Sequence, residues 1–230
     1  MDAQLKIPTH IAFIMDGNGR WARAKGLPRK VGHKYGVDAL KVVVDECDKL
    51  GIKVVTFYAF STENWSRPQD EIDALFEMIK KFAEKELDDY VKKGYRVHIL
   101  GDLTQIPTVT RECLEKIMTR SKDNGGLVVN IAINYGGRQE IVAAVNKIVQ
   151  NGVMHVDMQM IEDCLYTAGQ PSPDVIVRSS GEKRLSNFLL WQCAYSELIF
   201  VDEHWPDFDK KMMKRIVEEY SKRDRRFGKI

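Results

Sequence analysis

Short apolar runs alternate along this chain with longer segments in which apolar residues recur every three or four positions. The runs predict strands at 10–15, 53–60, 96–100, 127–133, 174–178 and 198–201. The second run is apolar at nearly every position, which is typical of a strand that is covered on both faces. The pattern therefore predicts a mostly parallel sheet with helices on each side.

The longer segments predict those helices. Apolar residues share one helical face over 37–50 and over 72–90, and further helices are expected to begin at Pro107 and near Gln139. The last helix is predicted from about Asp207, as an N-terminal cap, through Tyr220. Because no repeat, low-complexity tract or long linker interrupts the chain, we expect residues 1–230 to form a single α/β domain with a central six-stranded sheet.

Polar residues gather directly after four of the predicted strands. These clusters are Asp16, 61–64, 134–138 and 178–182. Ligands of parallel sheets bind beyond the carboxyl ends of the strands, so we expect all four clusters at one rim.

The first of these clusters combines a carboxylate with the turn 17–20, which holds two glycines, an amide and a guanidinium. Asp16 could ligate Mg²⁺ or cap the following helix, and the turn could be a simple chain reversal. The segment 178–187 places two arginines and three serines around a glycine, and arginine fits phosphate oxygens. A phosphorylated substrate held with Mg²⁺ explains the clusters together.

Composition narrows the class of protein. A net charge of +2 over 230 residues gives no support to a nucleic-acid partner. No apolar run approaches the ~20 residues that span a bilayer, and no segment resembles a signal peptide. We expect a cytoplasmic protein that at most contacts a membrane surface transiently. The four cysteines are dispersed and are expected to be buried, reduced thiols: Cys47, Cys113, Cys164 and Cys193.

Several well-known motifs are absent from the sequence. It contains neither a Gly-x-x-x-x-Gly-Lys-Ser/Thr phosphate loop nor a Gly-x-Gly-x-x-Gly dinucleotide motif. It also lacks the Gly-x-Ser-x-Gly elbow of hydrolases, and its histidines show no zinc spacing.

Five ordered blocks of the sequence resemble the cis-prenyltransferase family, best known from bacterial undecaprenyl diphosphate synthases. The blocks are 10–22, 32–36, 58–68, 130–138 and 178–208, and they extend over nearly the whole chain. The resemblance implies a Mg²⁺-dependent transferase that adds isopentenyl diphosphate repeatedly to an allylic diphosphate, usually farnesyl diphosphate. The product would be a long Z-polyprenyl diphosphate such as undecaprenyl diphosphate. Such a hydrocarbon chain needs an apolar tunnel between sheet and helices.

The resemblance also implies residue roles. Asp16 would manage Mg²⁺ and the allylic diphosphate, with Glu197 as a second metal carboxylate. Asn64, assisted by Ser61, would accept the proton lost on condensation, although an amide is a poor base. Substrate contacts are implied for Gly17, Asn18, Gly19, Arg20, Trp21, Arg29, His33, Ser61, Thr62, Glu63, Trp65, Arg67, Arg178, Arg184, Leu185, Ser186, Arg226 and Gly228.

The family motif at the C-terminus implies a homodimer. Arg226-Phe227-Gly228 matches a motif that reaches into the partner subunit's site, whereas without the resemblance it would be a basic tail. The chain departs from the family at Ser179, where threonine is common. At Lys183 some members carry a histidine near the metal, so Lys183 is not expected to bind it.

The sequence also permits other interpretations of the apolar helix faces and of the class of protein. The helix bearing Leu75, Phe76, Ile79, Phe82 and Ala83 could line the tunnel or could simply be core. A Mg²⁺-dependent phosphohydrolase would explain Asp16 but not the apolar helix faces. A non-catalytic partner subunit of a heteromeric prenyltransferase would have lost groups such as Asn64 and Arg178, which are present. An all-helical trans-type synthase is excluded by the strand pattern and by the absence of an Asp-Asp-x-x-Asp motif.

Overall fold

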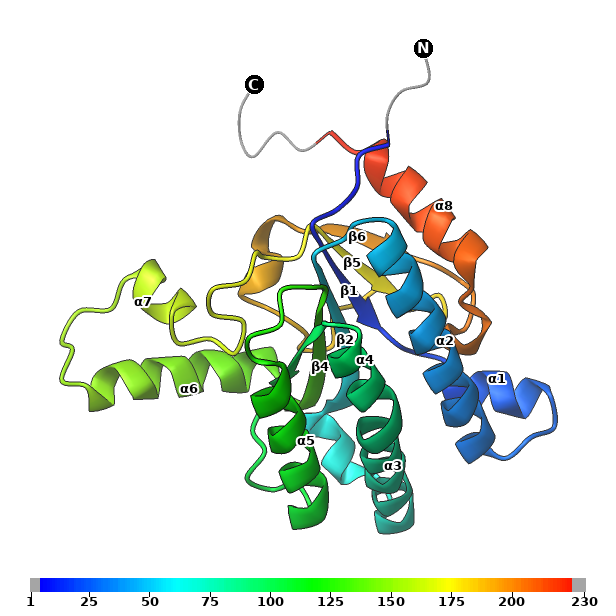
Figure 1. The fold of residues 1–230 in the computed structure, drawn as a ribbon, viewed down its shortest axis with the longest axis horizontal. Coiled ribbons are helices and arrows are strands. Elements are labelled where there is room, and N and C mark those ends of the chain that lie inside the picture. The colour runs from blue at the N-terminus through cyan, green and yellow to red at the C-terminus, as the bar shows by residue number, and fades with distance from the viewer. Residues whose placement is uncertain (1–4, 225–230) are drawn as a thin grey trace.

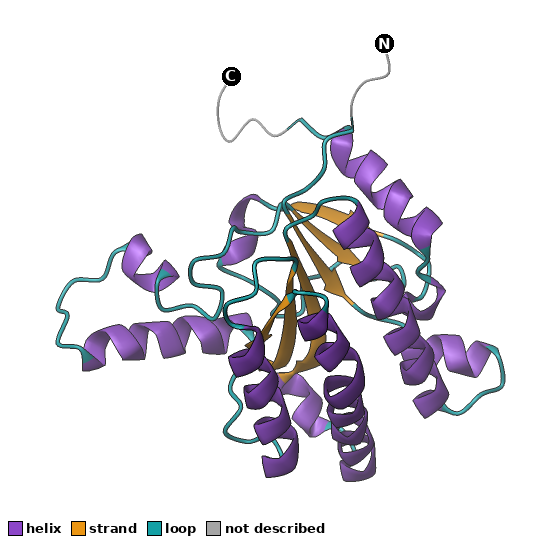
Figure 2. Ribbon diagram, viewed as in Figure 1, coloured by secondary structure: helices purple, strands orange, loops and turns teal. Residues whose placement is uncertain are grey.

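The computed structural model describes residues 5–224, in which helices and loops surround one six-stranded sheet (Figures 1 and 2). The strand order is β3-β4-β2-β1-β5-β6, and all the pairings between neighbours are parallel. Each strand lies within two residues of its predicted range: β1 His10–Ile14, β2 Val54–Ser61, β3 Arg96–Leu100, β4 Val128–Tyr135, β5 Val175–Arg178 and β6 Glu197–Phe200.

The helices include the predicted ones and two short additions. The helices predicted over 37–50 and 72–90 begin earlier, each directly after a proline, because Pro28 and Pro68 end the preceding extended segments. The described helices are α1 Asn18–Ala24, α2 Arg29–Lys49, α3 Gln69–Phe82, a π-helical segment Ala83–Leu87, α4 Asp88–Lys92, α5 Thr108–Ser121, α6 Gly137–Gln150, α7 Met158–Glu162 and α8 Lys210–Ser221. Short 3₁₀ turns lie at Thr62–Ser66, Gln192–Tyr195 and Trp205–Asp207.

The predicted start of the last helix at Asp207 is wrong. Helix α8 begins two residues after Phe208, and Asp209 caps it by accepting a hydrogen bond from the Met212 amide at 2.8 Å. Asp207 instead accepts the indole N–H of Trp21 at 2.6 Å. Because both aspartates precede an apolar periodic segment, the sequence pattern alone does not distinguish them.

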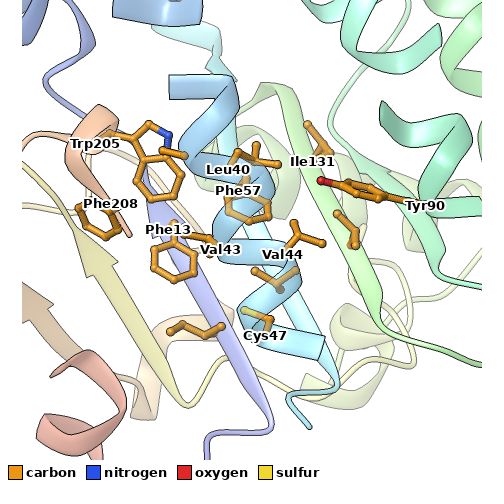
Figure 3. Packing of buried hydrophobic residues seen from close by; sticks show 14 of the residues in the cluster. Phe13, Leu40, Val43, Val44, Cys47, Phe57, Tyr90, Ile131, Trp205 and Phe208 are labelled. Carbon is orange, nitrogen blue, oxygen red and sulfur yellow. The ribbon is translucent and has the colours of Figure 1, made fainter. Parts of the chain in front are cut away.

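The main core lies between the sheet and the helices α2, α3, α5 and α8. Figure 3 shows Leu40, Val43 and Val44 of α2 over the strand residues Phe13 and Phe57. The rings of Phe13 and Phe57 stack with their centroids 5.6 Å apart. This packing explains why the middle of α2 is apolar along one side, and it fixes α2 against β1 and β2. All four cysteines are free, as expected, but only Cys47 is buried; the expected burial is wrong for Cys113, Cys164 and Cys193, which are partly exposed.

The opposite face of the sheet is covered by loops rather than by long helices, since α6 and α7 extend away from the body (Figure 1). A smaller apolar cluster there includes Ile14, Tyr135 and Phe188. Beside it, buried His10 has Nε2 at 2.7 Å from the Thr56 hydroxyl and Nδ1 at 2.7 Å from the Pro171 carbonyl. Since a carbonyl only accepts, Nδ1 donates to Pro171. Burial lowers the pKa of His10 to about 4, so the imidazole is neutral at pH 7.

No helix within residues 5–224 is long and apolar enough to cross a membrane.

Candidate active site

A cavity of about 890 Å³ lies at the carboxyl ends of β1, β2 and β5 and between the sheet and the helices α2, α3 and α5. Its volume falls within the range of about 300–1,000 Å³ typical of small-molecule sites. Polar residues line its mouth, and its apolar wall is formed by Val37, Leu40, Leu75, Met78, Ile79, Phe82, Leu114, Ile131 and Ile133. Of the helix residues considered for the tunnel, Phe76 and Ala83 are not in this wall but are buried in the core.

The ends of β2 and β4 are irregular where they meet the cavity. The register shifts after Tyr58, which makes Ala59 an extra residue on β2, and it shifts again opposite Asn134. Asn134 takes a left-handed backbone with φ 48°. Bulges bend a strand and redirect its side chains, and Ala59 consequently lies in the cavity wall.

Asp16 lies at the mouth of the cavity, two residues after β1. Its Oδ2 accepts a hydrogen bond from Arg178 Nη2 at 2.9 Å, and its Oδ1 accepts from the Gly17 amide at 2.7 Å. Arg20 approaches Oδ1 at 3.3 Å. Burial alone would raise the pKa of Asp16, but these hydrogen bonds and positive charges outweigh it and hold the pKa below its usual value. The carboxyl is therefore ionised at neutral pH, and it does not cap α1.

The turn after Asp16 requires glycine. Gly17 has φ 92°, and a Cβ atom there would lie 1.8 Å from Ser180 Oγ. The Ser180 hydroxyl is in turn 2.8 Å from His204 Nδ1, so the segment after β5 packs directly against this turn. The close approach brings Asp16 beside Arg178.

Arg178 is the most enclosed charged group of the site. Its side chain is only 5% exposed, against 30% for Asp16. Nη1 donates to Ser186 Oγ at 2.8 Å and to the Arg184 carbonyl at 2.5 Å. A buried guanidinium held by three acceptors has one fixed position. Arg178 thus joins the loop after β1 to the segment that follows β5.

A second cationic group lies across the mouth and consists of Arg29 on α2 and Arg67, which directly follows the 3₁₀ turn after β2. The Glu71 carboxylate bridges Arg29 at 3.1 Å and Arg67 at 2.8 Å. His33 lies beside them, and its buried Nε2 has no hydrogen-bond partner among the described residues. Burial, and then the charges of Arg29 and Arg67, lower the pKa of His33 to about 4, while Glu71 offsets part of this. His33 is accordingly neutral at pH 7.

The loop after β2 presents Asn64 to the cavity. Its Oδ1 accepts a hydrogen bond from the Ser61 amide at 3.1 Å, which fixes the orientation of the side-chain amide. Trp65 points the other way, donating to Asn134 Oδ1 at 2.8 Å and packing on Phe76 with a centroid distance of 5.4 Å. The loop is therefore anchored in the core by Trp65 and exposes Asn64.

Comparison with known proteins identifies the family. The family described as putative undecaprenyl diphosphate synthase matches residues 14–228. An isoprenyl transferase of Clostridium perfringens is 48% identical over 231 residues, covering 98% of this chain and 91% of that protein. The corresponding protein of Aquifex aeolicus is 42% identical and covers 98% of each chain. This chain belongs to the cis-prenyltransferase family.

Solved cis-prenyltransferase-like structures share its fold. Lavandulyl diphosphate synthase from Lavandula x intermedia, solved with dimethylallyl diphosphate, has a TM-score of 0.93 at 32% identity, covering 97% of this chain and 99% of that one. A probable undecaprenyl diphosphate synthase from Campylobacter jejuni has a TM-score of 0.83 at 33% identity, covering 98% of this chain and 100% of that one.

Most of the residues implied by the family resemblance meet at one cavity. Those that line it are Asp16, Gly17, Asn18, Gly19, Arg20, Arg29, His33, Ser61, Glu63, Asn64, Arg67, Arg178 and Ser186. The structure does not place Trp21, Thr62, Trp65, Arg184 or Leu185 in the lining. The Trp21 ring packs at a tilt against Tyr35 with a centroid distance of 4.7 Å, and its indole N–H donates to Asp207.

The structure does not bring Glu197 to Asp16 within the chain. Glu197 begins β6 and is level with Val175 of β5, which pairs with Ile11 of β1. At ~3.3 Å per residue and ~4.8 Å per strand, Glu197 is about 10 Å back along the sheet from the end of β1 and two strands away. Its carboxylate is 3.9 Å from Arg223. Arg226 and Gly228 lie outside the described residues.

Sequence reasoning assigned no site role to other members of the lining, notably Arg23, Tyr58 and Asn187, nor to Glu71, which pairs with two of the arginines. Arg23 was recognisable as a neighbour of Arg20 on one helical turn. An acidic residue in the first turn of a helix, such as Glu71, usually indicates only the helix N-terminus. Its pairing with Arg29 depends on how α2 and α3 pack.

Proposed function

We propose that this cis-prenyltransferase condenses isopentenyl diphosphate repeatedly with an allylic diphosphate, farnesyl diphosphate in the first instance, to give a long Z-polyprenyl diphosphate of the undecaprenyl type. The observation that carries this proposal is the cavity itself, with a cationic, hydrogen-bonding mouth and a long apolar wall. That combination fits a molecule with a diphosphate at one end and a growing hydrocarbon at the other. A phosphohydrolase would have no use for the apolar wall.

The two diphosphates are assigned to two parts of the mouth. Arg20, Arg29 and the turn 17–19 would hold the allylic diphosphate. Arg178 and Ser186, already hydrogen-bonded to each other, would hold isopentenyl diphosphate. Fixed guanidinium groups stabilise the charge that develops on the leaving diphosphate without having to reorganise.

Mg²⁺ is the cofactor we propose, and the donor set fits it. Within residues 5–224 no cluster of three or more histidine, cysteine or acidic side chains is placed to hold a metal by itself. Magnesium usually takes one or two carboxylates and completes its shell with water and substrate phosphate oxygens. The ionised Asp16 at the cavity mouth supplies such a carboxylate. When bound, the ion would neutralise charge on the diphosphate leaving group.

The proton lost on condensation needs an acceptor. We assign to Asn64 the role of positioning that acceptor. Its Oδ1 already accepts the Ser61 amide, and an amide oxygen is weakly basic. The Nδ2 group can donate to a diphosphate oxygen, which makes the released diphosphate the stronger candidate base. Ser61 supports Asn64 through its backbone.

We further propose a homodimer in the cytoplasm, with transient membrane contact when the apolar product leaves. Glu197 and Arg223 lie together toward the amino ends of the strands, two strands away from β1 and away from their own Asp16. Both would therefore serve a site only in a partner subunit. No nucleic acid is proposed as a partner, in keeping with the net charge of +2.

One experiment tests the reaction. The purified protein is incubated with farnesyl diphosphate, labelled isopentenyl diphosphate and Mg²⁺, and the dephosphorylated lipids are sized by chromatography. We expect a ladder that ends in a long Z-polyprenol. A product of one condensation would contradict repeated elongation, and phosphate release without isopentenyl diphosphate would indicate a hydrolase.

A further inference from the structure

Asn187 is connected to three segments that follow three different strands. It lies in the segment after β5, and its Nδ2 donates to Glu63 Oε1 at 2.9 Å in the loop after β2. The same Nδ2 donates to Gln139 Oε1 at 3.0 Å, while Oδ1 accepts from the Arg138 amide at 2.9 Å. The Asn187 carbonyl accepts from the Gly137 amide at 2.7 Å. One residue thus ties together the segments after β2, β4 and β5.

These hydrogen bonds complete the start of helix α6. The first amides of a helix have no partner within it, and the residue before α6 is Gly136, which has no side chain to offer. Asn187 satisfies two of those amides from a distant part of the chain. A Cβ on Gly136 would lie 2.7 Å from Asn187 Nδ2 and 2.8 Å from Thr62 Oγ1, so the three segments are closely packed here.

The backbone at Asn187 is held in an unusual conformation. Ser186 has φ 49° and Asn187 has φ 65°, two consecutive left-handed residues without a glycine. Asparagine adopts this region more readily than most residues, whereas serine does so seldom. Strained backbone of this kind persists only where surrounding bonds fix it. This turn points the Ser186 hydroxyl at Arg178, from which it accepts a hydrogen bond at 2.8 Å.

We propose that Asn187 is a positioning residue that holds the loop carrying Asn64 in register with the segment carrying Ser186 and Arg178. The inference rests on the proposed function, in which these two segments hold the reacting ends of the substrates. Asn187 acts through Glu63 on one side and through Ser186 on the other. Because condensation requires the reacting carbons to approach to ~3–3.5 Å, a displacement of ~1 Å between the segments costs about 10²-fold in rate.

The position of Asn187 predicts which kinetic constants depend on it. Its hydrogen bonds reach the isopentenyl side and the loop after β2, but not Arg20 or Arg29. Its loss is expected to raise KM for isopentenyl diphosphate and to lower kcat. KM for the allylic diphosphate is expected to stay close to that of the unaltered protein.

Three substitutions separate the contributions of backbone and side chain. Asn187→Gly keeps the left-handed backbone and removes only the side-chain hydrogen bonds. Asn187→Ala removes both. Asn187→Asp keeps the acceptor for Arg138 but places a carboxylate against Glu63. A matched control is Asn124→Ala, because Asn124 Nδ2 also donates twice, to the carbonyls of Val91 and Tyr95, but lies outside the cavity lining.

For Asn187→Gly we expect about a tenfold rise in KM for isopentenyl diphosphate, about a 10²-fold fall in kcat, and an allylic KM within about twofold. Its melting temperature should resemble that of Asn124→Ala, which keeps normal kinetics. Adding Glu63→Gln to Asn187→Asp should restore activity relative to Asn187→Asp alone, because the new amide donates to the new carboxylate. The cycle is completed by Glu63→Gln alone.

Two results would overturn the proposal. One is unaltered kinetics in Asn187→Gly. The other is an equal rise in KM for both substrates together with a lowered melting temperature, which would indicate general destabilisation. Calorimetric binding of isopentenyl diphosphate, measured without allylic substrate, separates this proposal from the proposed function. If the protein binds isopentenyl diphosphate and Asn187→Gly weakens it about tenfold, the positioning role stands even where no elongation occurs. If the protein does not bind it at all, both proposals fail.

Discussion

At the scale of single residues, the Asp16 carboxylate combines a structural role with the catalytic role that we propose for it. Asp16 faces the cavity with 30% of its side chain exposed, yet it also neutralises the enclosed Arg178. Removing the whole carboxyl would leave a buried guanidinium without its partner. That costs about 3–5 kcal/mol for a fully buried pair, and less here because Asp16 is partly exposed. A test of its catalytic role must therefore keep an acceptor for Arg178.

Asp16→Asn meets that condition. The amide oxygen can still accept from Arg178, while the charge that would hold Mg²⁺ and balance the diphosphate is lost. We expect prenyl transfer to fall by at least about 10²–10³-fold, with a melting temperature within a few degrees of the unaltered protein. Steady-state turnover and thermal denaturation measure the two quantities. Near-normal turnover would refute the assignment, and Asp16→Ala should be the less stable of the two variants.

His10 gives a prediction about pH. Burial, partly offset by the Pro171 hydrogen bond and Asp174, lowers its pKa from 6.5 to about 4. Between these values the unfolded chain binds more protons than the folded chain, so the free energy of unfolding rises with pH. The contribution is fully present above about pH 6.5, is lost as the pH falls toward 4, and amounts to about 3 kcal/mol.

Urea denaturation between pH 4.5 and 7 measures this slope. His10→Gln should reduce it by up to ~1.4 kcal/mol per pH unit, even if the variant is less stable at every pH. His33, whose pKa is lowered to a similar value, should leave a remaining slope. An unaltered slope in His10→Gln would contradict a neutral, buried imidazole.

At the scale of elements, the sequence predicted what depends on local pattern. The six strands followed from short apolar runs, and the long helices followed from apolar periodicity. The start of α8 was misplaced because Asp207 and Asp209 have the same capping chemistry. They differ only in their tertiary contacts: Asp207 accepts the indole N–H of Trp21, which leaves Asp209 to cap the helix. Which side of the helix 69–92 faces a cavity was equally undetermined, because core and tunnel wall are both apolar.

The cavity wall provides a matched pair of substitutions at this scale. Ala59, on the bulge of β2, lines the cavity, whereas Ala83 is fully buried in packed core. Ala59→Leu should shorten the lipid product, because the added methyl groups occupy volume that the chain needs. Ala83→Leu should cost about 1–3 kcal/mol of stability through overpacking and leave product length unchanged.

Chromatography of the dephosphorylated lipids, beside a denaturation curve for each variant, tests both expectations. The same atoms are added at both positions, so each variant serves as the control for the other. Shortened products from Ala83→Leu, or unchanged products from Ala59→Leu, would show that the lipid follows a different path along the sheet.

At the scale of the whole molecule, the sequence indicated a shared rim but not the distances across it. Parallel strands place their carboxyl ends together, so Asp16, Asn64 and Arg178 were expected at one edge and line one cavity. Glu197 does not lie at this edge, because it is the first residue of its strand rather than the residue after its end. Likewise, the hydrogen bonds of Asn187 join segments more than 40 residues apart in the sequence. No local sequence pattern predicts such contacts.

A dimer resolves the position of Glu197 if each chain contributes to its partner's site, and this can be tested with two impaired variants. Asp16→Asn removes a group of the chain's own site, and Arg226→Ala removes the tail residue that the family motif assigns to the neighbour. Each variant alone should be badly impaired. When the two are unfolded, mixed equally and refolded, random assortment makes half of the dimers mixed, and each mixed dimer has one site with neither substitution. Activity should return to about a quarter of that of the unaltered protein. If Arg226 serves its own chain, no mixed dimer has an intact site, so absence of recovery in mixtures whose mixed dimers are confirmed by mass would rule out the shared site.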